Sequence, residues 1–130
     1  MFNREELFIK TFIIKDRQER YLSLVTSKKG RNKFLQDLPH SISNELDPKY
    51  VKGVNGSSKD IYEKLKSKGA GKECYVISEL SEIDGHVLSL SEALNQIIGR
   101  GMAAILICID NKLAYFEGEE PNDRYILHRP

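Results

Sequence analysis

An uninterrupted apolar run near the C-terminus constrains the fold of this chain most strongly. The run covers residues 103–109 and has the length and composition of a strand that is covered on both faces. Asp110 and Asn111 follow it, and both residue types tolerate the positive φ of a two-residue hairpin turn. Return strands are then expected over 113–117 and 124–129, with the last one at the sheet edge. The C-terminal half is therefore predicted to be an antiparallel meander.

A short apolar strand and a capped helix are predicted before this meander. The strand covers residues 74–77, and the segment 89–92 (Ser-Leu-Ser-Glu) has the pattern of a capping box. Apolar residues recur at helical spacing from Leu90 to Ile98. The helix permits a parallel crossover between the strands that flank it.

The first 70 residues are predicted to be mainly helical. Caps with a carboxylate three residues later satisfy free N–H groups and suit the positive helix end. Such pairs are Asn3 with Glu6, Asp16 with Glu19, and Ser57 with Asp60; Ser27 begins a further helix that ends before Pro39. Residues 7–14 are also β-branched and aromatic enough for a strand, so helix and strand both remain open there. Residues 39–57 are expected to be a connecting loop.

These patterns predict a single α+β domain over residues 1–130. A basic helical part, 1–70, packs on a small mixed, mainly antiparallel sheet from an acidic part, 72–130, in the order β-α-β-β-β. No stretch approaches the ~18 apolar residues of a membrane span, so no membrane partner is expected. The N-terminus lacks the basic start of a signal peptide, which favours a cytoplasmic location and two buried free thiols at Cys74 and Cys108.

Charge is distributed unevenly along the chain. Residues 1–72 contain 16 basic and 9 acidic residues, whereas residues 73–130 contain 4 basic and 10 acidic ones. Such asymmetry indicates either an anionic partner or two halves that attract each other. The overall net charge is only +1 at pH 7.

The basic residues group on two predicted helices. The candidate binding residues are Lys28, Lys29, Arg31, Lys33, Lys64 and Lys68, with Lys59 and Lys66 beside them. Clustered positive charge suits an acidic protein surface or a nucleic-acid backbone, although solvated helix faces have the same composition. The isoelectric point of about 7.7 is low for a dedicated nucleic-acid-binding protein.

Acidic side chains are expected where predicted strands end. The candidate catalytic residues are Glu79, Asp84, His86, Glu117 and Glu119, with Glu82 nearby. If these ends adjoin, the carboxylates would suit Mg²⁺ or Mn²⁺ in a hydrolase or phosphodiesterase. A solvated acidic rim would show the same pattern. No metal or other cofactor is predicted outside this alternative.

The sequence favours a small binding or interaction protein over an enzyme. No Gly-x-Ser-x-Gly elbow and no phosphate-binding loop occurs. The basic helical surface would contact an acidic partner or nucleic acid, and the terminal edge strand could form a homodimer. The metal-dependent hydrolase is the alternative, and a small-molecule sensor with a pocket between helices and sheet is a third class.

Overall fold

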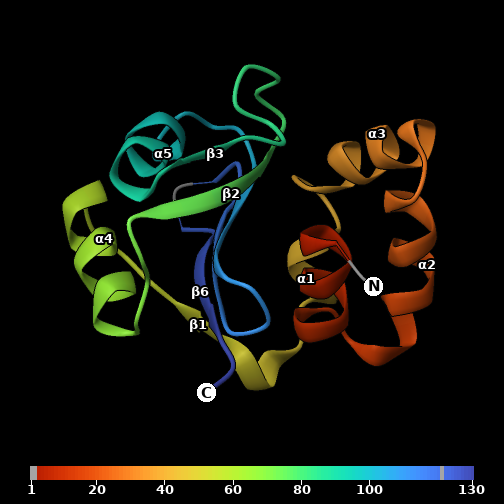
Figure 1. Cartoon of the computed structure of the whole chain (residues 1–130), viewed down its shortest axis with the longest axis horizontal. Helices are drawn as coiled ribbons and strands as arrows, with labels where there is room; N and C mark the ends of the chain where they lie inside the picture. The colour runs from red at the N-terminus through yellow and green to blue at the C-terminus, as the bar shows by residue number, and fades with distance from the viewer. Residues whose placement is uncertain (1–2, 121) are drawn as a thin grey trace.

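The computed structural model describes residues 3–120 and 122–130, and it has an α+β fold. A six-stranded sheet lies between two helical layers (Figure 1). The helices are α1 (Arg4–Phe12), α2 (Lys15–Val25), α3 (Lys28–Asp37), α4 (Ser58–Ser67) and α5 (Leu90–Ile97), with 3-10 turns at Ile42–Glu45 and Pro48–Tyr50. The strands are β1 (Val51–Gly53), β2 (Glu73–Ser78), β3 (Val87–Ser89), β4 (Ala104–Ile109), β5 (Leu113–Glu117) and β6 (Arg124–His128).

Most of the predicted helix starts are confirmed. Asn3 and Ser57 form reciprocal capping boxes, and the side chains of Ser27 and Ser89 accept hydrogen bonds from backbone N–H groups in the first turn. The prediction for Asp16 is wrong, because α2 already begins at Lys15 and places this carboxylate inside its first turn. There it favours the positive helix end without capping it.

Residues 7–14 contain both structures that the sequence left open. Helix α1 continues to Phe12, and the chain then becomes extended at Ile13. Ile13 forms an isolated antiparallel bridge with Leu46, from the segment predicted to be a loop. The β-branched end of this segment therefore contributes a single bridge, while its amphipathic part is helical.

The predicted meander β4–β5–β6 is confirmed, but the sheet around it differs from the expectation. The strand order is β1-β6-β5-β4-β2-β3, and every pairing between described strands is antiparallel, so the mixed pairing does not occur. Strand β3 reverses the chain before α5, which is why β2 and β4 run in opposite directions. Strand β6 is not the edge, because β1 pairs with its outer side. Strand β6 therefore has a paired neighbour on both sides, β5 and β1.

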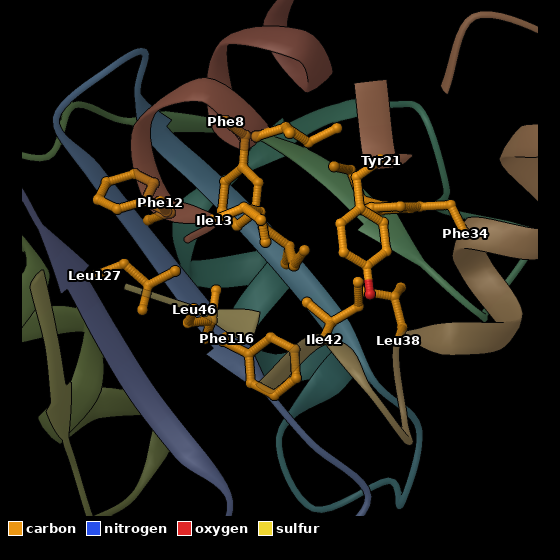
Figure 2. Packing of buried hydrophobic residues seen from close by; sticks show 14 of the residues in the cluster. Phe8, Phe12, Ile13, Tyr21, Phe34, Leu38, Ile42, Leu46, Phe116 and Leu127 are labelled. Atoms are coloured by element: carbon orange, nitrogen blue, oxygen red, sulfur yellow. The ribbon is translucent and has the colours of Figure 1, made fainter. Parts of the chain in front are cut away.

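Two hydrophobic cores form because side chains alternate across the sheet. Ile105 and Ile107 of β4 face the α1–α3 layer, whereas Leu106 and Cys108 face α4 and α5. Figure 2 shows the first core, where the rings of Tyr21 and Phe34 pack edge to face with centroids 5.7 Å apart. The N-terminal helices α1–α3 therefore cover one face of the sheet, and α4 and α5 cover the other.

A glycine allows α3 to approach α2 closely. A Cβ atom on Gly30 would lie 2.3 Å from the carbonyl oxygen and 2.9 Å from the Cα atom of Leu24. Both atoms belong to the backbone of the α2 helix, which a side-chain rotation cannot move. Among the described helices, none combines the length and apolar character that a membrane crossing requires.

Candidate functional site

The predicted acidic site does not assemble. Glu79 accepts a hydrogen bond from the Ala103 N–H at 2.6 Å, and Asp84 pairs with Arg31. Glu119 lies at the surface, 3.8 Å from the Nδ1 atom of His40. Within residues 3–120 and 122–130, no group of three or more His, Cys, Asp or Glu side chains is arranged to hold a metal ion. His86 is exposed to solvent.

Glu117 is the most deeply buried of these candidates, with 2% of its surface exposed. Its carboxylate accepts hydrogen bonds from the Tyr115 hydroxyl at 2.5 Å and the Gly99 N–H at 3.1 Å. The Nε atom of Arg124 lies 3.0 Å away, close enough for an ion pair although not aligned for a hydrogen bond. Burial, followed by the hydrogen bond to Glu117, raises the pKa of Tyr115. Glu117 therefore anchors β5 to its surroundings.

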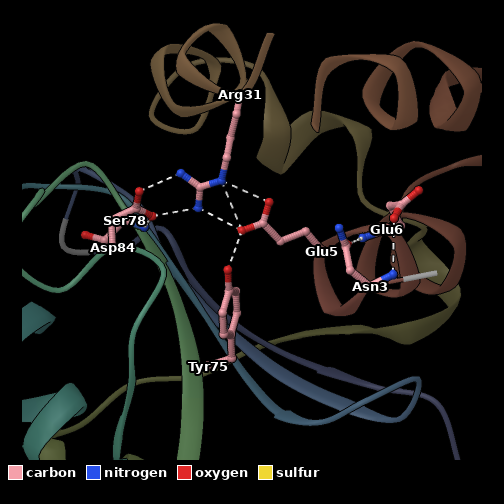
Figure 3. A network of polar contacts seen from close by, with 7 residues as sticks. All are labelled: Asn3, Glu5, Glu6, Arg31, Tyr75, Ser78 and Asp84. Carbon is pink, nitrogen blue, oxygen red and sulfur yellow. Dashed lines mark hydrogen bonds and ion pairs between the residues drawn. The ribbon is translucent and has the colours of Figure 1, made fainter. Parts of the chain in front are cut away.

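Arg31 occupies the centre of a second polar network (Figure 3). Its guanidinium donates to both carboxylate oxygens of Asp84 at 2.6 and 2.9 Å and to Glu5 at 2.8 to 3.1 Å. The Tyr75 hydroxyl donates to Glu5 at 2.6 Å, and the Ser78 N–H donates to Asp84 at 3.0 Å. These contacts join α1 and α3 to β2 and to the turn that follows it.

The Arg31 network shifts two pKa values in directions that follow from its contacts. Hydrogen bonds to Asp84 and then to Glu5 raise the pKa of Arg31, so its charge is permanent. Burial, followed by the hydrogen bond to Glu5, raises the pKa of Tyr75 to about 12, so this hydroxyl remains a donor. Glu5 was not among the predicted site residues, because in the sequence it resembles any acidic residue in the first turn of a helix.

Part of the charge asymmetry is accounted for by ion pairs within the molecule. Arg31 pairs with Asp84, and Arg4 pairs with Asp110 at 2.9 Å. Both pairs connect the basic N-terminal part of the chain to the acidic C-terminal part. Arg31 is therefore committed to an internal contact and differs from the exposed lysines with which it was grouped.

The predicted basic surface divides into two. Lys28, Lys29 and Lys33 belong to α3, whereas Lys64 and Lys68 belong to α4 and its C-terminal cap. These helices lie in opposite layers, with the sheet between them (Figure 1). Lys29 and Lys33 line an open groove of about 620 Å³ between α2 and α3. No single ligand can lie on both helices without passing around the sheet.

A more strongly basic depression lies between β1 and α4. Two adjoining hollows of about 220 and 230 Å³ share Lys52, Lys68 and Ile126 in their walls. Lys64 lines the first hollow and Lys49 the second. We refer to Lys49, Lys52, Lys64 and Lys68 as the lysine cleft. None of the four makes an ion pair with another residue in the described part of the chain.

His128 lies at the wall of the lysine cleft. Burial, together with the positive charge of Lys68, lowers the pKa of His128 below its ordinary value of 6.5. The imidazole thus senses the positive potential of the cleft. Lys64 and Lys68 were predicted binding residues, whereas Lys49 and Lys52 were not, because these two lie in a segment that was predicted to be a loop.

The other predicted features have simpler roles. The thiols of Cys74 and Cys108 are free and buried, as expected, and burial raises the pKa of Cys74 to about 12. A hollow of about 230 Å³ near Arg100 and Met102 is lined also by Ser78 and Ile97. It is smaller than the roughly 300 Å³ at which small-molecule sites usually begin.

Comparison with known proteins adds no functional assignment, since no protein-family model, curated protein or solved structure matches this chain.

Proposed function

We propose that this chain is a non-enzymatic interaction protein that binds an acidic partner protein through the lysine cleft. The observation that supports the proposal is the convergence of four lysines, none with an ion-pair partner among the described residues, on two adjoining hollows. Like charges held together repel each other, so an anionic ligand is favoured there. The cleft combines this charge with a concave shape. The open groove beside α3 is also concave, but only two lysines line it.

The negative end of α4 accounts for only part of the cleft. Lys64 and Lys68 lie in the last turn of α4 and at its C-terminal cap, where positive charge is favourable. Lys49 and Lys52 come from a different segment and are outside this helix. Their position opposite Lys68 has no such local explanation, and it is the feature that an acidic ligand would use.

A protein partner fits the cleft better than a nucleic acid does. Arginine is the residue that best recognises phosphate groups, because its planar guanidinium donates two parallel hydrogen bonds. Among the described residues that line the cleft, none is an arginine. Arg4, Arg17, Arg20, Arg31 and Arg124 each pair with a carboxylate of this chain. A local group of lysines on a chain whose net charge is only +1 suits the carboxylates of an acidic segment.

Fluorescence polarisation with a labelled decapeptide of alternating Glu and Thr tests this proposal. The variant Lys52→Gln/Lys64→Gln/Lys68→Gln should bind at least about tenfold more weakly than the wild type, since three partly exposed pairs at ~0.5 kcal/mol each correspond to that factor. The control Lys28→Gln/Lys29→Gln/Lys33→Gln has the same charge change on the opposite layer and should bind within about twofold of the wild type.

Two results would contradict the proposal. The first is an equal loss of peptide binding in both triple variants, which would indicate non-specific charge attraction. The second is tighter binding of a twelve-nucleotide single-stranded DNA that depends on the same three lysines. That result would identify a nucleic-acid partner instead. Circular dichroism of all variants confirms that each remains folded.

A further inference from the structure

The sheet ends at β1, and the outer side of this strand is unpaired in the described structure. β1 is one of the two terminal strands in the sheet order, opposite to β3, and its pairing is with β6 (Figure 1). Lys52 and Gly53 are both exposed to solvent. An open edge of this kind presents backbone N–H and C=O groups that a further strand can pair with.

The register shows which backbone groups face outward. The Val54 N–H donates to the Arg124 carbonyl oxygen at 3.0 Å, so Val54 faces β6. The backbone N–H and C=O groups of neighbouring residues in an antiparallel strand point alternately to its two sides. The backbone groups of Lys52 therefore point toward β6, and those of Val51 and Gly53 point toward the open edge. The register partner of Lys52 is Ile126, in agreement with this alternation.

The open edge and the lysine cleft adjoin each other. Because Lys52 is directly opposite Ile126, both side chains are on the same face of the sheet, and both line the cleft. On this side α4 supplies Lys64 and Lys68. The space around Gly53 is open, because a Cβ atom built on it meets nothing within 4 Å.

We propose that the acidic partner binds as an extended segment that adds a strand to the outer edge of β1. This inference rests on the proposed function, and it specifies the bound conformation. The segment's backbone would pair with Val51 and Gly53, while alternate carboxylates would face the lysine cleft. The lysines also disfavour pairing with a second copy of this chain. In such a pair, Lys52 and Lys68 of one copy would lie against Lys52 and Lys68 of the other, and like charges repel.

Replacing Gly53 by proline tests the backbone pairing directly. Proline removes the outward N–H group and leaves the hydrogen bonds to β6 unchanged. Gly53→Pro should weaken binding of the alternating Glu–Thr decapeptide at least about fivefold. The matched control Gly53→Ala retains the N–H group, places its Cβ in open space, and should bind within about twofold of the wild type.

The outcomes separate this inference from the proposed function. If Gly53→Pro and Gly53→Ala bind equally well while the triple variant of Lys52, Lys64 and Lys68 does not bind, strand addition is wrong and the acidic partner remains. If the triple variant binds like the wild type, the proposed function itself is wrong. Should Gly53→Pro not fold, amide hydrogen exchange of the wild type decides: strand addition requires slower exchange at Gly53 with peptide, and unchanged exchange overturns it.

Discussion

Replacing Arg31 by methionine should destabilise the fold strongly, because this side chain joins three elements. Methionine preserves much of the aliphatic volume but removes every donor. Glu5 and Asp84 would then lose the guanidinium that lies 2.6 to 3.1 Å from their oxygens. Their side chains are only 8% and 15% exposed, so water cannot replace it fully.

The magnitude follows from the burial and from the contacts that remain. Removing one partner of a fully buried ion pair costs about 3–5 kcal/mol. The Arg31 side chain is 22% exposed, and Tyr75 and Ser78 would still donate to the two carboxylates. We therefore expect a loss of about 2–4 kcal/mol in the free energy of unfolding. At roughly 4 °C per kcal/mol, the melting temperature should fall by about 8–16 °C.

Urea denaturation followed by circular dichroism measures this loss. Lys28→Met serves as the control, because Lys28 is an exposed residue of the same helix and its replacement should change stability by less than about 0.5 kcal/mol. Adding Glu5→Gln to Arg31→Met should cost less than the two single losses together, since the residues interact. A loss below about 1 kcal/mol for Arg31→Met would refute the structural role of the network.

Three further predictions concern other parts of the molecule. Gly30→Ala should destabilise the fold by roughly 2 kcal/mol in urea, despite alanine's advantage of about 1 kcal/mol in a helix, because its Cβ would collide with the Leu24 backbone; a gain in stability would contradict this. The pKa of His128, measured by NMR, should lie below 6.5 and rise in Lys68→Met. Because this pKa is lowered in the folded state, the contribution of His128 to the free energy of unfolding should decrease as the pH falls through 6.5. An unchanged pKa in Lys68→Met would show that Lys68 does not act on His128. Millimolar Mg²⁺ or Mn²⁺ should shift the melting temperature by less than about 1 °C, because Glu79, Asp84 and Glu117 each bind a donor of the protein; a rise of several degrees would favour the metal-dependent alternative.

Local sequence signals predicted the parts of the fold that depend on local physics. The apolar run at 104–109 and the turn at Asn111, with φ of 68°, define the hairpin without information from distant residues. The caps at Asn3 and Ser57 are equally local. By contrast, β1 has only three residues and no apolar alternation, so its pairing with β6 depends on the assembled sheet.

The candidate site was less predictable, because proximity in the sequence does not determine proximity in space. Glu117 ends one predicted strand and Asp84 follows another, yet each accepts hydrogen bonds from a residue of a different element. Arg31 resembles its lysine neighbours in sequence, but its contact with Glu5 depends on how the tertiary structure places α3 relative to α1. Lys52 joins the cleft only because β1 pairs with β6 opposite Ile126. These contacts are all long-range.

The most direct test of the proposed function is an NMR titration of the ¹⁵N-labelled chain with the alternating Glu–Thr decapeptide. Our account predicts that the largest amide shifts map to Lys49, Lys52, Gly53 and Lys68, accompanied by a rise in the pKa of His128 as anionic groups enter the cleft. Amide shifts confined to α3 would contradict this account. The absence of amide shifts at peptide concentrations that saturate the fluorescence polarisation signal would also contradict it.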